Sequence, residues 1–313
     1  MITVSREDVA RLLDWPALID TLRDAFADGF VAPVRHHHTI ETGGAAATLL
    51  LMPAWRAGEH VGVKIATVFP DNAERSLPAV SASYFLMSAE TGAPLAVIEG
   101  SELTARRTAA ASALASRYLS RKDSARLLMV GTGRLAPNLI AAHCAVRPIE
   151  RVSIWGRSEA RAEALAARLR GEQGIDARAV ADLPAALADT DIVSCATLSR
   201  TPLVRGDRLQ PGTHVDLVGA FTPQMRETDD ETVRRASLFV DTYGGAFAEA
   251  GDIVQPLAAK VIGKSSVKAE LAELVKGAHR GRAGPEEITL FKSVGAAIED
   301  LAAAILVYRR LTP

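Results

Sequence analysis

The sequence predicts an α/β protein with two domains, a doubly wound parallel sheet and a smaller α+β lobe. A length of 313 residues suggests two domains, or one large domain with a smaller one attached. From residue 126 onward, short apolar segments alternate with helical ones, which is typical of a parallel sheet covered by helices. Before residue 120, several strands follow one another and a long helix comes after them, which indicates an α+β lobe.

Composition limits the classes of partner. Hydrophobic residues make up 48% and charged residues 23%, the usual balance of a soluble globular protein, and the net charge is -1. No basic excess favours nucleic acid or an anionic membrane, so we expect small-molecule partners. Cys144 and Cys195 lack metal-ligand spacing and are expected to be buried free thiols of a reducing compartment. The N-terminal segment lacks the apolar core of a signal peptide and no apolar run spans a membrane, so we expect a cytoplasmic location.

Two short helices are expected at the N-terminus. Ser5 and Asp8 have the spacing of a capping box for the first helix, which ends before Trp15. Asp14 precedes the second helix, and Gly29 ends it. The apolar residues of the second helix share one face, as in a helix packed on a sheet: Leu18, Leu22, Ala25 and Phe26.

A polar stretch then contains Arg35 and three consecutive histidines, His36, His37 and His38. Three adjacent histidines cannot all face one metal ion, and no carboxylate or cysteine accompanies them at ligand spacing. We therefore expect a partly exposed loop or strand and no metal site.

The remaining elements follow from the hydrophobic patterns. In the first lobe, strands are expected at residues 48–52, 61–68, 83–88 and 95–99, and a helix at 101–119. In the second half, strands are expected at residues 127–130, 152–155, 176–180, 192–194, 215–218 and 238–240, and helices at 135–146, 158–170 and 184–188. A last helix, 295–311, is expected to fold back onto the first lobe. The predicted domains are therefore 1–119 with 292–313, which is discontinuous, and 120–291.

The segment RLLMVGTGRLA, from Arg126 to Ala136, has the pattern of the first strand, turn and helix of a Rossmann dinucleotide-binding domain. Glycine permits the tight turn and lets the backbone approach a pyrophosphate, which binds at the N-terminus of the following helix. A lone glycine pattern is weak evidence, and the alternating strands and helices around it strengthen the assignment. The predicted cofactor-binding residues of the turn are Gly131, Thr132, Gly133, Arg134, Leu135 and Ala136.

The residues after the second strand of this domain indicate which dinucleotide is bound. An acidic residue there would bind the ribose hydroxyls of NAD(H), but the sequence has Gly156, Arg157 and Ser158. Because Arg157 and the Ser158 hydroxyl suit a 2′-phosphate, we expect NADP(H) to be preferred, with NAD(H) possible. Alternatively, Arg157 is solvated and Ser158 only caps the next helix.

Several blocks in the same order resemble the ornithine cyclodeaminase and mu-crystallin family across nearly the whole chain. They are GVKIATVFPDN (62–72), LTARRTAAASALASRYL (103–119), LLMVGTGRLA (127–136), LVGAFTPQMRETDDE (217–231) and TLFKSVGAAIEDLAAA (289–304). The resemblance implies a homodimer whose N-terminal lobe provides the subunit interface and the substrate pocket. It also places nicotinamide contacts at Thr197 and Ser293.

The family resemblance implies that Arg35, Lys64 and Arg107 converge on a substrate carboxylate. Cationic groups from three elements can bind one small anion when folding brings them together. The family pattern LTAxRTAA selects Arg107 over Arg106, and adjacent helix residues point about 100° apart, so one of the two should face the pocket. Without the family, each cation would be interpreted as a surface charge.

Ornithine cyclodeaminases resemble the block 217–231 but carry an aspartate at the position of Phe221. That aspartate binds the distal amino group of the diamino acid. Phenylalanine cannot pair with an ammonium, and a buried unpaired cation is costly, so a diamino acid is a poor candidate. An apolar ring suits a cyclic imine, and GAFTPQMRE resembles the ketimine-reductase branch. Alternatively, Phe221 is simply packed and does not touch substrate.

These observations predict an oxidoreductase that reduces pyrroline-2-carboxylate or piperideine-2-carboxylate to proline or pipecolate. Lys64 is the predicted catalytic residue, which donates a proton itself or through water. Rival functions within the family are a cyclodeaminase, an alanine dehydrogenase, or a reductase that forms N-alkyl amino acids. The rival from another class is a non-catalytic, crystallin-like NADPH-binding protein.

Overall fold

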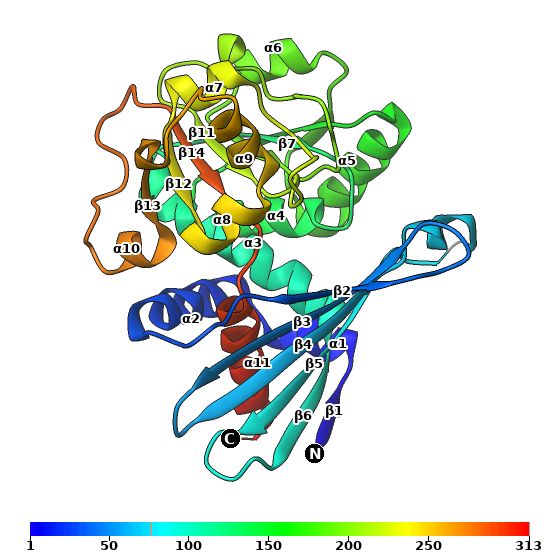
Figure 1. Ribbon diagram of the computed structural model, residues 1–313. Coiled ribbons are helices and arrows are strands. Elements are labelled where there is room, and N and C mark those ends of the chain that lie inside the picture. Colours follow the sequence, from blue (N-terminus) through cyan, green and yellow to red (C-terminus); the bar gives the residue numbers. More distant parts are fainter. Residues whose placement is uncertain (76, 313) are drawn as a thin grey trace. The chain divides into compact units, whose positions relative to one another are not determined.

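The computed structural model describes residues 1–75 and 77–312, which divide into two compact units (Figure 1). Unit 1 comprises Met1–Thr108 with Ala296–Pro313, and unit 2 comprises Ala109–Gly295. Both boundaries differ from those expected after residues 119 and 291. The first lies inside the long helix α3 (Gly100–Leu119), because the two halves of that helix make their contacts in different units.

Unit 1 is a six-stranded sheet in the order β1-β6-β5-β4-β3-β2 with helices packed on it. Its strands are β1 (Ile2–Val4), β2 (His36–Ile40), β3 (Ala47–Arg56), β4 (His60–Val68), β5 (Val80–Ser88) and β6 (Pro94–Glu99). Its helices are α1 (Arg6–Leu12), α2 (Trp15–Asp28), the 3-10 turn η1 (Pro70–Arg75), the first half of α3, and α11 (Ala297–Leu311). The predicted caps are confirmed: Ser5 and Asp14 accept backbone N–H groups, and Gly29 ends α2 in the left-handed conformation.

The expected strands of this unit are present, and the short strand β1 was not predicted. β1 pairs with β6 in parallel, whereas the other neighbours are antiparallel. The histidine triplet forms the exposed edge strand β2, paired with β3. An exposed edge strand carries no hydrophobic alternation, so its sequence looked like either a loop or a strand.

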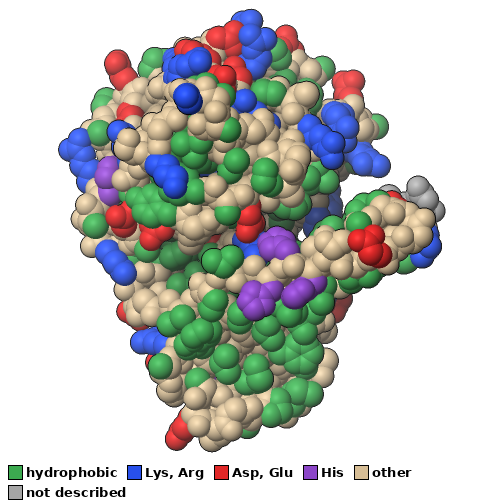
Figure 2. Space-filling view, in the orientation of Figure 1, with side chains coloured by type: hydrophobic (Ala, Val, Ile, Leu, Met, Phe, Trp, Pro, Cys, Tyr) green, Lys and Arg blue, Asp and Glu red, His purple; other side chains and the backbone are tan. Residues whose placement is uncertain are grey.

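The two faces of the unit 1 sheet differ in burial. Helix α11 packs against β3, β4 and β5, and the residues on that face are buried, among them Met52, Lys64 and Tyr84. Along each strand, residues of this face alternate with residues of the other face, which carries half-exposed apolar side chains: Leu49, Leu51, Pro53, Trp55, Val61, Val63, Ile65, Phe85, Met87, Leu95 and Val97. Figure 2 shows hydrophobic side chains gathered over this sheet, with histidines beside them.

Unit 2 is an eight-stranded, fully parallel sheet in the order β13-β12-β14-β11-β10-β7-β8-β9, as the doubly wound prediction requires. Its strands are β7 (Arg126–Val130), β8 (Arg151–Trp155), β9 (Ala177–Ala179), β10 (Ile192–Cys195), β11 (His214–Leu217), β12 (Ser237–Val240), β13 (Val267–Glu270) and β14 (Thr289–Lys292). Its helices after α3 are α4 (Ala136–Cys144), α5 (Glu159–Gln173), α6 (Leu183–Ala188), α7 (Asp230–Arg235), α8 (Tyr243–Glu249), α9 (Gly251–Ala258) and α10 (Leu271–Val275), with 3-10 turns η2 (Gly206–Arg208) and η3 (Lys264–Ser266).

Helices cover both faces of this sheet. On one face, strand residues such as Val130, Val193 and Leu217 share a core with α6, α7, α8 and α9. Helices α4 and α5 pack on β7 and β8. Of the two cysteines, Cys195 is buried as predicted, whereas Cys144 is half-buried; both are free thiols.

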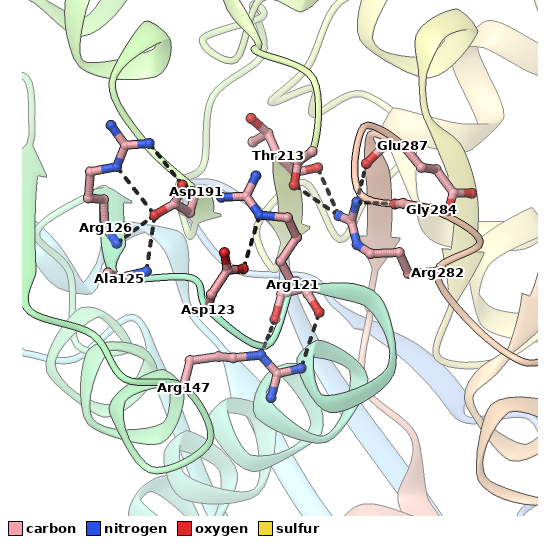
Figure 3. A network of polar contacts seen from close by, with 12 residues as sticks. Arg121, Asp123, Ala125, Arg126, Arg147, Asp191, Thr213, Arg282, Gly284 and Glu287 are labelled. Atoms are coloured by element: carbon pink, nitrogen blue, oxygen red, sulfur yellow. Dashed lines mark hydrogen bonds and ion pairs between the residues drawn. The ribbon is translucent and has the colours of Figure 1, made fainter.

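Arginines hold the C-terminal end of α3 at the amino edge of the unit 2 sheet (Figure 3). Arg147 donates to the carbonyls of Ser116 and Arg117, and Arg282 donates to the carbonyl of Leu119. Cationic donors are favourable at a helix C-terminus, where carbonyls lack intrahelical partners. This cluster therefore anchors the second half of α3 within unit 2. Across the described residues, no helix is long and apolar enough to cross a membrane.

Candidate active site

A buried cluster of two cations and two carboxylates lies inside unit 1. Lys64 on β4 pairs with Asp300 at 2.8 Å, and the Arg107 Nε group on α3 donates to the other oxygen of Asp300 at 2.9 Å. The Arg107 Nη1 group donates to Glu299 at 2.5 Å. Lys64 is 3% exposed, Arg107 4% and both acids 0%, so the cluster is shielded from bulk water.

Arg35 also acts on this cluster. Its positive charge is among the causes that lower the pKa of Lys64. The pairing of β2 with β3, extended by one residue, puts Arg35 opposite Met52, and Met52 is the partner of Lys64 on the next strand. Arg35 and Lys64 therefore share one face of the sheet, with Met52 between them.

Arg106 points away from the cluster. Its guanidinium bonds Glu102 and the Leu13 carbonyl, and it stacks over the Trp15 ring at 5.3 Å. Of the two adjacent arginines, only Arg107 joins the buried cluster, as the helical periodicity requires.

The electrostatics of the cluster favour a charged but easily deprotonated Lys64. Burial, the Arg107 charge and the Arg35 charge lower the pKa of Lys64 to about 8, while Asp300 opposes them. Burial works to raise the pKa of Asp300, but the charges of Arg107 and Lys64 outweigh it and lower that pKa. A lysine whose pKa is near neutrality is suited to proton transfer.

Asp300 and Glu299 were missed by the sequence analysis as site residues. Both stand in the first turn of α11, where acidic residues are favoured by the helix dipole, and Glu299 also accepts the Ala296 N–H. Acids at these positions look like ordinary capping residues. Lys64 and Arg107 lie about 200 residues earlier in the chain, so the neighbouring sequence does not reveal this pairing. The one available hint was the presence of two acids inside an Ala/Leu-rich helix.

In unit 2, the predicted cofactor turn has the geometry of a phosphate-binding turn. Gly131 has φ of +120°, and a Cβ there would lie 2.7 Å from the Ala196 carbonyl oxygen. Gly133 is exposed, and a Cβ on it would meet no atom within 4 Å, so a ligand could approach its backbone. No side chain caps the first turn of α4, where Leu135 is the N-cap residue and Ala136 is buried. These features suit the pyrophosphate of a dinucleotide.

The turn lies where the strand order of the sheet reverses. β8 and β9 extend from β7 on one side, and β10 and β11 on the other, so the switch point falls between β7 and β10. Ligands of doubly wound sheets bind at such points, outside the carboxyl ends of the strands. The predicted residues of unit 2 stand within about four residues after the ends of β7, β8, β10, β11 and β14: Thr132, Arg134, Gly156, Arg157, Ser158, Thr197, Phe221 and Ser293.

The residues after β8 are compatible with both predicted roles, binding of a 2′-phosphate by Arg157 and Ser158, or a solvated Arg157 beside a helix-capping Ser158. Arg157 is exposed, and no acidic residue follows this strand before Glu159. Ser158 is the N-cap of α5 and accepts the Arg161 N–H, so it does cap the helix. Gly156 packs tightly on Thr132, because a Cβ at Gly156 would lie 2.7 Å from the Thr132 methyl group.

Thr197 is fixed by a buried carboxylate that the sequence analysis missed. Its N–H and its hydroxyl both donate to Glu227, at 2.6 and 2.7 Å. Burial raises the pKa of Glu227 to about 7, an effect that the Lys292 charge opposes and the Asp252 charge reinforces. Lys292 pairs with Asp252 at 3.2 Å and donates to the Gly219 carbonyl.

These contacts hold the segment that carries Phe221. Gly219 is held by Lys292, and Ala220 has a left-handed φ of +49° and accepts the Gly251 N–H. Phe221 itself is 40% exposed. This exposure leaves both interpretations of Phe221 open, contact with the substrate or packing without such contact. Ser293 is buried and its N–H donates to the Leu217 carbonyl.

The fold and the two sites define an α/β protein with a dinucleotide-type glycine turn in one unit and a buried cation cluster in the other. The chain belongs to the ornithine cyclodeaminase/mu-crystallin family, whose sequence profile matches residues 2–313. It is 38% identical to a Delta(1)-pyrroline-2-carboxylate reductase of Colwellia psychrerythraea over 315 residues, 99% of each chain.

Solved structures agree with this assignment. The chain resembles Thermococcus litoralis Delta(1)-pyrroline-2-carboxylate reductase in complex with NADH and L-proline, with a TM-score of 0.93, 37% identity and coverage of 99% and 97%. It also resembles an archaeal alanine dehydrogenase dimer with bound NAD, with a TM-score of 0.90, 31% identity and coverage of 98% and 94%.

Proposed function

We propose that this chain is a nicotinamide-dependent oxidoreductase that reduces cyclic 2-carboxy imines, such as pyrroline-2-carboxylate or piperideine-2-carboxylate, to the cyclic amino acids. The observation that carries the proposal is the buried pairing of Lys64 and Arg107 with Asp300, with Arg35 on the same face of the sheet. The relatives named Delta(1)-pyrroline-2-carboxylate reductase support the substrate class.

The reaction adds a hydride to the imine carbon and a proton to the imine nitrogen. The cofactor, when bound, supplies the hydride. Arg35 and Arg107 bind the substrate carboxylate, and Lys64 donates the proton, directly or through a water molecule, which makes the imine a better hydride acceptor. A Lys64 pKa near 8 leaves the ammonium charged at neutral pH while making proton release easy.

The glycine turn after β7 and the first turn of α4 hold the cofactor pyrophosphate. For the adenosine end we propose a preference for NADP(H) over NAD(H), which rests on Arg157 and on the lack of an acidic residue before Glu159. The similar structures contain NADH or NAD, so NAD(H) is the alternative that a direct comparison must test.

Phe221 selects against diamino acids. It is partly exposed after the carboxyl end of β11, where an apolar ring can contact an uncharged substrate ring but cannot pair with an ammonium. A Phe221→Asp variant should bind ornithine more tightly than the wild type. If it gains no affinity for ornithine, this role of Phe221 is wrong.

We also propose a homodimer formed through the open face of the unit 1 sheet. Its half-exposed side chains, such as Leu51, Trp55, Val63 and Phe85, form an apolar surface of the kind that obligate interfaces bury. The archaeal alanine dehydrogenase is a dimer, which supports this assembly. Light scattering that shows a monomer at micromolar concentration would contradict it.

A substrate panel tests the function. NADPH and NADH oxidation is followed with both imines, and ammonia release is followed with ornithine. We expect imine-dependent oxidation and no ammonia. Ammonia from ornithine without imine turnover would identify a cyclodeaminase, and cofactor binding without any turnover would support the crystallin-like alternative.

A further inference from the structure

The shared carboxylate of Asp300 joins the two cations of the unit 1 cluster. One oxygen lies 2.8 Å from Lys64 Nζ and the other 2.9 Å from Arg107 Nε, so a single side chain sets the spacing of both groups. Asp300 is 0% exposed and sits in the first turn of α11, which packs on β4 beside Lys64. A residue so placed has few alternative conformations.

A buried ion cluster of this kind is an expensive way to stabilise a fold. Hydrophobic residues of similar volume often stabilise a core equally well or better, so a buried ion pair is weak evidence for a purely structural role. Lys64, in particular, would lose its charge readily at this depth without a carboxylate, because burial disfavours the ammonium form.

The groups around Lys64 divide into those that favour the ammonium and those that oppose it. Arg107 on α3 and Arg35 before β2 oppose it with like charge. Tyr84, the partner of Lys64 on β5, stays neutral because burial and Asp300 raise its pKa well above the usual value, and its hydroxyl has no hydrogen-bond partner among the described residues. Asp300 is the carboxylate at ion-pair distance from Lys64.

We propose that Asp300 is a positioning residue for catalysis, which keeps Lys64 in its ammonium form and fixes it beside Arg107. This rests on the proposed function, because it assigns Asp300 a role in delivering the proton to the imine. Glu299 provides a natural contrast. It is equally buried and neighbours Asp300 in sequence, but it forms an ion pair with Arg107.

The test measures the protonation of Lys64 directly. In protein labelled with ¹³C at lysine Cε, NMR chemical shifts are followed against pH, and the Lys64 signal is assigned by its loss in Lys64→Arg. The wild-type midpoint is expected near pH 8. In Asp300→Asn it should fall by about one to three pH units, the usual effect of an adjacent opposite charge. In the control Glu299→Gln it should move by less than about half a unit, because Glu299 pairs with Arg107 and is not among the groups that set the pKa of Lys64.

The kinetic readout should follow the same pattern. The fall of kcat/KM at alkaline pH should move to lower pH in Asp300→Asn and stay in place in Glu299→Gln. Asp300→Ser serves as a second neutral variant if the asparagine variant does not fold, and Asp300→Glu should restore the midpoint toward the wild-type value.

The two proposals fail in different ways. A wild type that reduces no imine contradicts the proposed function, but the NMR midpoint still tests Asp300. A midpoint that is unchanged in the neutral Asp300 variants, or that moves equally in Glu299→Gln, would overturn the role of Asp300.

Discussion

Replacing Arg107 by lysine separates charge from geometry in the proposed carboxylate site. The guanidinium donates to two different carboxylates, through Nε to Asp300 and through Nη1 to Glu299. A lysine ammonium keeps the positive charge but cannot reproduce this fork, so one acid loses its partner. A hydrogen bond to a charged group contributes about 1.5–3 kcal/mol, so loss of one such bond from Arg107 to the substrate carboxylate should lower kcat/KM for pyrroline-2-carboxylate about 10- to 150-fold.

The adjacent Arg106→Lys variant is the matched control. Arg106 also forms an ion pair, a backbone hydrogen bond and a stacking contact, with Glu102, Leu13 and Trp15 respectively. Its replacement therefore changes packing in unit 1 without touching the buried cluster, and kcat/KM should stay within about twofold because Arg106 contacts neither Lys64 nor Asp300. Initial rates and thermal unfolding are measured for both variants. Equal losses of kcat/KM, or a loss of thermal stability alone in Arg107→Lys, would refute the reasoning.

Three further predictions concern the cofactor unit. Gly131→Ala should lower the Tm, because the φ of Gly131 is +120° and a Cβ there would lie 2.7 Å from a backbone oxygen. Gly133→Ala should leave the Tm unchanged and weaken NADPH binding in a fluorescence titration, because a Cβ there meets no protein atom within 4 Å but would face the ligand. Unchanged binding in Gly133→Ala would contradict the assigned turn. Arg157→Asp should reduce the ratio of NADPH to NADH kcat/KM by about tenfold or more, because a carboxylate repels the 2′-phosphate, and an unchanged ratio would show that Arg157 is a solvated residue. Because burial raises the pKa of Glu227 from 4.5 to about 7, the folded chain holds a proton between these pH values that the unfolded chain releases. Stability should therefore fall as pH rises through this range, relative to Glu227→Gln, and parallel curves of Tm against pH would argue against it.

The sequence predicted the fold best where patterns are local. The caps at Ser5 and Asp14, the long helix from residue 101, and the strand and turn around Gly131 depend on neighbours within a few residues, and the structure contains all of them. The missed strands lack such signals. β1 has three residues and pairs with β6 far along the chain, and β14 ends in the buried Lys292, which a hydrophobic pattern does not anticipate.

The site was predicted in the same uneven way. Lys64 and Arg107 were identified from the family resemblance, but their partners were not, because Asp300 and Glu299 occur about 200 residues away in an unremarkable helix start. Glu227 was missed for a similar reason. Its bonds to Thr197 form only when the segments after β10 and β11 come together. The pairing of β10 with β11 brings these segments together.

Isotope transfer tests the central claim most directly. The protein is incubated with pyrroline-2-carboxylate and with reduced nicotinamide cofactor that carries deuterium at both C4 positions, and the product is analysed by mass spectrometry and NMR. The proposed reaction predicts proline that carries one deuterium at Cα, formed in step with the oxidised cofactor. Proline without deuterium, or ammonia released from ornithine in place of imine reduction, would contradict it.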